Sequence, residues 1–81
     1  MSLSQQLLEG FGRLGLSGRG DKGNFVLFSH ENAAGIFADL QNMDIIVRPL
    51  AGYGLKEYLR VTIGSEEQNA RLLEALSSLL N

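Results

Sequence analysis

The chain has 81 residues, a formal net charge of −2 and no cysteine. This length suits one small domain, and the slight acidity gives no general field for nucleic acid or an anionic membrane surface. The lack of cysteine excludes disulfides, and no apolar run approaches the ~18 residues of a membrane span. The N-terminal residues do not resemble a signal peptide. We therefore expect a single cytoplasmic domain over residues 1–81, without nucleic-acid or membrane partners.

The first half of the chain predicts two helices and one strand. Apolar residues recur at helical spacing as far as Leu14, and Gly15 is suited to end that helix. Residues 17–24 lack apolar periodicity, so we expect a flexible Gly-rich connection there. A short apolar strand follows at residues 24–28. The next helix has an apolar stripe formed by Ala33, Ile36, Phe37, Leu40 and Met43.

The second half predicts two more strands and a final helix. Residues 44–50 form a strand that Pro49 ends or confines to a sheet edge, because proline has no N–H. Residues 58–63 form a strand in which Leu59, Val61 and Ile63 alternate with Tyr58, Arg60 and Thr62. Ser65 and Gln68 then form a capping box at the start of a leucine-rich helix.

The order α-β-α-β-β-α predicts an α+β fold with two layers. The β-α-β unit should be a right-handed crossover. In a split β-α-β arrangement the third strand lies between the other two. We therefore expect a three-stranded mixed sheet with strand order 1-3-2 and helices on one face.

Two short motifs carry little chemistry by themselves. Residues 18–23 match G-x-G-x-x-G, but the segment follows a helix and opens a strand, the reverse of a dinucleotide-binding loop. We therefore interpret it as a loop. His30 is the only histidine, so we expect no metal site and no catalytic triad.

Arg48 and Arg60 are the candidate binding residues. Each lies on a predicted apolar strand, and Arg60 is on the face opposite to Leu59, Val61 and Ile63. A guanidinium fork on a strand suits a carboxylate or phosphate, to which charge-assisted hydrogen bonds contribute roughly 1.5–3 kcal/mol each. A cross-strand ion pair with Glu57 or Asp44 is the alternative. The pattern alone leaves both interpretations open.

From Asn24 onward the chain resembles the C-terminal small domain of histidinol-phosphate aminotransferases, which are pyridoxal-phosphate enzymes of the aspartate-aminotransferase fold type. Four segments carry the resemblance: Asn24-Phe25-Val26-Leu27-Phe28, Ile46-Val47-Arg48-Pro49-Leu50, Gly52-Tyr53-Gly54-Leu55 and Tyr58-Leu59-Arg60-Val61-Thr62-Ile63-Gly64. The last of these is the most specific. The first helix also fits, as the one leading into this domain.

The resemblance implies roles for the two arginines. Arg60 corresponds to the arginine that holds the α-carboxylate of the amino-acid substrate, and Arg48 to the basic residue that helps bind the phosphate end. The Schiff-base lysine of the family belongs to a larger domain, and neither Lys22 nor Lys56 lies in its sequence setting. We therefore expect no catalytic residue, no bound pyridoxal phosphate and no activity from this chain alone, with substrate bound only together with the large domain.

Two other functions are compatible with the sequence. A stand-alone interaction or regulatory module could use the same fold, and its unpaired sheet edges would favour a homodimer. A related pyridoxal-phosphate enzyme, such as a threonine-phosphate decarboxylase or an aromatic aminotransferase, has a similar small domain. The substrate depends mainly on residues outside this segment.

Overall fold

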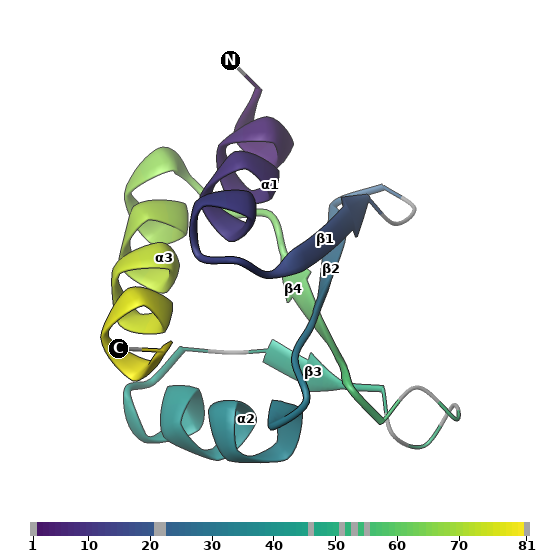
Figure 1. Cartoon of the computed structure of the whole chain (residues 1–81). Helices are drawn as coiled ribbons and strands as arrows, with labels where there is room; N and C mark the ends of the chain where they lie inside the picture. The colour runs from purple at the N-terminus through teal and green to yellow at the C-terminus, as the bar shows by residue number, and fades with distance from the viewer. Residues whose placement is uncertain are drawn as a thin grey trace.

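The computed structural model describes residues 2–20, 23–45, 47–50, 52, 54 and 56–80. Pairs of strands follow α1 and α2, and α3 ends this part of the chain (Figure 1). Their bounds are α1 Leu3–Arg13, β1 Ser17–Gly20, β2 Phe25–Ser29, α2 Ala33–Asn42, β3 Val47–Pro49, β4 Tyr58–Thr62 and α3 Glu66–Leu80. The predicted α+β class is confirmed. The helices lie where the apolar periodicity places them.

The described strands form one sheet in the order β1-β2-β4-β3, and every neighbouring pair is antiparallel. The predicted three-stranded mixed sheet is therefore wrong in strand number and in being mixed, whereas its three strands lie in the order β2-β4-β3 within the observed sheet. Because α2 carries the chain back between β2 and β3, these two strands run in the same direction. β4 lies between them and is antiparallel to both, which leaves no parallel pair hydrogen-bonded.

The additional strand is β1, within the segment for which the sequence pattern predicts a flexible connection. Ser17 pairs with Ser29, and Gly20 pairs with Val26. Asp21 and Lys22 of the same segment lie outside the described residues. No apolar periodicity marks β1 because its inward positions are glycines. A Cβ on Gly18 would lie 2.8 Å from Cδ2 of Phe11, so the missing side chain lets β1 approach α1.

The helices cover one face of the sheet and bury it. Five inward residues of β2, β3 and β4 are apolar and buried: Val26, Phe28, Val47, Leu59 and Val61. Helix residues pack on them from α1, α2 and α3: Leu7, Phe11, Ile36, Leu40, Leu72 and Leu76. The rings of Phe11 and Phe28 lie 5.0 Å apart between centroids. In Figure 1, α1 lies beside α3, while α2 follows the β3 side of the sheet. The opposite face carries no helix among the described residues.

The close approach at Gly18 predicts a large effect of a single methyl group. Gly18→Ala is expected to lower the free energy of unfolding by about 1–3 kcal/mol, because the new Cβ must displace the fully buried Phe11. Gly20→Ala is the matched control on the same strand, where a Cβ meets no atom within 4 Å. That variant should be neutral or slightly stabilising. Urea unfolding of both variants measures the difference, and equal midpoints would contradict the steric argument.

Candidate functional site

Three arginines lie in one row across the open face of the sheet. The register pairs Arg19 with Leu27, Leu27 with Arg60, and Arg60 with Arg48. Side chains of directly paired residues project from the same face, with Cα atoms about 4.5–5.5 Å apart in antiparallel sheets. Three guanidinium groups therefore share this surface, which we call the arginine face (Arg19, Leu27, Arg60 and Arg48). The outward positions of the described strands contain no Asp or Glu.

Two of these arginines stack on aromatic rings. The Cζ atom of Arg60 lies 4.3 Å from the ring centroid of Phe25, and that of Arg19 lies 5.3 Å from the ring centroid of Tyr58. Both distances are within the ~6 Å range of cation–π attraction. Arg60 is half-buried, whereas Arg19 and Arg48 are exposed. The arginine at the centre of the sheet is thus the more restrained one.

The register argues against cross-strand ion pairs for Arg48 and Arg60. The residues directly opposite Arg60 are Leu27 and Arg48, and neither is an acid. Glu57 precedes β4, and its backbone carbonyl accepts a hydrogen bond from the His30 N–H at 2.8 Å. Asp44 lines a different cavity, beside α3. Like charges placed directly opposite each other destabilise a sheet, so the pair is better suited to an anion from outside the sheet.

Arg48 and Arg60 line the same cavity. It has a volume of about 580 Å³, and its walls are Phe25, Phe37, Val47, Arg48, Pro49, Arg60 and Thr62. The structure thus brings both predicted binding residues together. Apolar walls lower the local dielectric, which strengthens the attraction between a guanidinium and an anion. The arrangement can bind a carboxylate or phosphate, and the described lining residues include no His, Cys, Lys, Asp or Glu.

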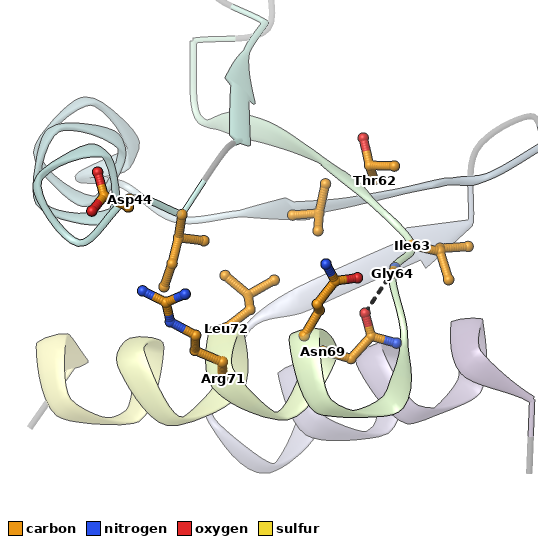
Figure 2. Close-up of a pocket in the computed structure, with 10 residues that line it drawn as sticks. Asp44, Thr62, Ile63, Gly64, Asn69, Arg71 and Leu72 are labelled. Atoms are coloured by element: carbon orange, nitrogen blue, oxygen red, sulfur yellow. Dashed lines mark hydrogen bonds between the residues drawn. The ribbon is translucent and has the colours of Figure 1, made fainter.

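A second cavity of about 340 Å³ lies where β4 meets α3 (Figure 2). Asn69 is at its base and is only 2 % exposed. Its Oδ1 accepts a hydrogen bond from Gly64 N–H at 3.0 Å. Its Nδ2 donates to the Leu3 carbonyl at 3.3 Å and to Gln6 Oε1 at 3.1 Å. From its position on α3, Asn69 thereby connects this helix to the end of β4 and to α1.

Arg71 borders the same cavity and has a structural contact. Its Nη2 donates to the Met43 carbonyl at 2.8 Å, in the turn that follows α2. Asp44 completes this turn with φ of 61°, a left-handed conformation that Asp tolerates better than most residues. The polar groups of this cavity thus hold chain segments together. Sequence reasoning missed Asn69, although its position three residues before Leu72 continues the buried stripe of α3.

Other kinds of site find little support in the described part of the chain. No three side chains among its His, Asp and Glu residues gather closely enough to hold a metal ion. His30 accepts a hydrogen bond at Nδ1 from the Asn32 N–H at 2.9 Å, which fixes the turn before α2. None of the described helices combines the length and apolar character needed to cross a membrane. The cavity at the arginine face is therefore the candidate functional site.

Comparisons with known proteins agree on one family. The profile of the aminotransferase class I and II family matches residues 1–76. The chain is 49% identical over 76 residues to histidinol-phosphate aminotransferase 1 of Dechloromonas aromatica and to histidinol-phosphate aminotransferase of Methylobacillus flagellatus. In both cases the match covers 94% of this chain and 21% of the relative, so the chain spans about a fifth of their length.

A solved structure extends the similarity to three dimensions. The histidinol-phosphate aminotransferase of Clostridium acetobutylicum superposes with a TM-score of 0.86 at 26% identity. The superposition covers 98% of this chain and 25% of that protein. The family profile matches nearly the whole sequence, and the four-stranded sheet with its helices has a counterpart in a solved member. The chain therefore belongs to the class I and II aminotransferase family.

Proposed function

We propose that this chain is the C-terminal small domain of a histidinol-phosphate-type aminotransferase and supplies its anion clamp for substrate. Arg60 holds the α-carboxylate of the amino-acid substrate, and Arg48 binds the phosphate end of the phosphorylated one. The observation that carries the proposal is the direct opposition of these two arginines in one cavity without an acidic cross-strand partner. The 49% identity to histidinol-phosphate aminotransferase 1 of Dechloromonas aromatica supports the choice of substrate class.

The chemistry of the pair fits this role. A guanidinium presents its N–H groups as a planar fork that matches two oxygens of a carboxylate or phosphate. An anion between Arg48 and Arg60 would remove the repulsion between them and gain charge-assisted hydrogen bonds of roughly 1.5–3 kcal/mol each. Because β4 is an interior strand that is paired on both sides, Arg60 is held on a rigid element, while Arg48 lies on the edge strand β3.

The residues described here do not fit the cofactor of the family, pyridoxal phosphate. That group forms a Schiff base with a lysine, which must be desolvated or placed beside another cation to react at neutral pH. Lys56 is the one lysine among the described residues, and it is exposed in the loop before β4. Lys22 lies outside the described residues. We therefore assign substrate contacts to this chain and the reacting lysine to the remainder of the enzyme.

A domain exchange tests the proposed function. The segment of the Dechloromonas aromatica enzyme that aligns with this chain is replaced by the present sequence. The hybrid is expected to bind pyridoxal phosphate and to transaminate histidinol phosphate with 2-oxoglutarate, because the clamp would be restored. The 81-residue chain alone should give no transamination in the same assay. A hybrid that retains bound pyridoxal phosphate but performs neither half-reaction would contradict the proposal.

A further inference from the structure

The side chain of Arg60 leans along the sheet rather than straight across it. Its direct cross-strand partners are Leu27 and Arg48, whereas Phe25 is paired with Thr62, two positions further along the ladder. Nevertheless the Arg60 Cζ lies 4.3 Å from the Phe25 centroid. Diagonal neighbours on a sheet face are within reach of long side chains. Leu27 offers no acceptor and Arg48 repels, so the Phe25 ring is the favourable contact for this guanidinium.

The contact with Phe25 leaves the binding edge of Arg60 available. A cation–π contact uses the flat face of the guanidinium, whereas hydrogen bonds to a carboxylate use the N–H groups in its plane. Phe25 and Arg60 line the same cavity of about 580 Å³. A ring stacked on that flat face restrains the arginine and keeps its N–H donors available to an anion. Such restraint reduces the conformational freedom that must be lost when the anion binds.

We propose that Phe25 is a positioning residue that holds the Arg60 guanidinium ready for the substrate carboxylate. This inference rests on the proposed function, since it assigns a second residue to the same clamp. Arg19 on Tyr58 provides an internal comparison on the same face. Tyr58 lies in a neighbouring row, paired with Ser29, and stacks with an exposed arginine at the longer distance of 5.3 Å. Removing the Tyr58 ring should therefore leave Arg60 unaffected.

The test uses ¹⁵N-labelled 81-residue chain and the Nε–Hε signals of its arginines. Arg60 Hε is expected upfield of Arg48 Hε because of the Phe25 ring current. Glutamate binding is measured in the hybrid enzyme, where the large domain is present. Phe25→Leu should abolish the upfield shift in the chain and raise the KM of the hybrid for glutamate by about three- to tenfold, the cost of immobilising one long side chain. Phe25→Tyr should preserve both observations, and Tyr58→Leu should change neither.

The outcomes separate the inference from the function on which it rests. If Arg60→Gln abolishes the glutamate reaction of the hybrid while Phe25→Leu leaves its KM for glutamate unchanged, the positioning role is wrong and the clamp stands. If the Arg60→Gln hybrid reacts with glutamate as the unsubstituted hybrid does, the clamp itself is wrong. Backbone amide spectra verify that each variant remains folded. An Arg60 Hε signal that coincides with Arg48 Hε in the wild type would also overturn the inference.

Discussion

Replacing Arg60 with Ala in the hybrid enzyme is expected to lower kcat/KM for glutamate by about 100-fold or more, because two charge-assisted hydrogen bonds are lost. Arg60→Lys should lower kcat/KM for glutamate by about tenfold, less than Arg60→Ala, since an ammonium keeps the charge but cannot reproduce the planar fork. Steady-state kinetics of the glutamate half-reaction measure both effects. If Arg60 binds the substrate equally in the ground state and the transition state, its loss will raise KM. If Arg60 makes the interaction only in the transition state, its loss will lower kcat.

Two other arginines on the same face serve as matched controls. Arg19→Ala removes an exposed guanidinium two strands away and should leave kcat/KM for glutamate unchanged. Arg48→Ala should impair the reaction of histidinol phosphate more than that of glutamate, because its proposed ligand is the phosphate. An Arg60→Lys hybrid with the kinetics of the unsubstituted hybrid would remove the assignment of Arg60 to the carboxylate.

Asn69→Leu is expected to lower the free energy of unfolding by about 2–4 kcal/mol. Leucine conserves most of the volume, so the loss reports on hydrogen bonds rather than on a cavity. The Gly64 N–H, the Leu3 carbonyl and the Gln6 amide oxygen would each lose their partner. Small domains have total stabilities of only ~5–15 kcal/mol, so this single change removes a large share. Urea unfolding followed by circular dichroism measures the effect.

The same substitution at an exposed site provides the control. Asn42 is the exposed last residue of α2, and Asn42→Leu should change the stability by no more than about 0.5 kcal/mol. If both variants unfold at the same urea concentration, the network of Asn69 contributes nothing to stability. If Asn69→Leu is destabilised as expected, its native-state spectrum should show the largest shifts at Gly64 and in α1, where the lost partners lie.

The sequence predicts those features that depend on local alternation. Leu59 and Val61 lie inward and Arg60 outward, because successive side chains of a strand point to opposite faces of the sheet. The position of Arg48 opposite Arg60 depends on the register of β3 and β4, which no local pattern determines. Strand β1 is invisible to hydrophobic periodicity, because its inward residues are Gly18 and Gly20.

The surroundings of the site follow from tertiary structure rather than from local pattern. Phe25 belongs to an apolar strand, and its sequence environment is that of a core residue. The sheet register places it instead beside Arg60 on the open face. Asn69 occupies a position of the apolar stripe, and its hydrogen-bond partners come from a helix 63 and 66 positions earlier in the chain. Contacts between residues so far apart in the sequence depend on how α1 packs on α3, and the local sequence pattern does not determine that packing.

The packing of the first helix, α1, on the last helix, α3, has a consequence for biosynthesis. Gln6 donates to the Glu66 carbonyl and accepts from Asn69, partners 60 and 63 positions away. At synthesis rates of about 5–20 residues per second, α1 is synthesised roughly 3–12 s before α3. During that interval the side chains of Leu7 and Phe11, which α3 helps to bury, lack part of their cover. This domain can complete its core only after translation of its last helix, and until then part of the apolar face of α1 stays uncovered on the nascent chain.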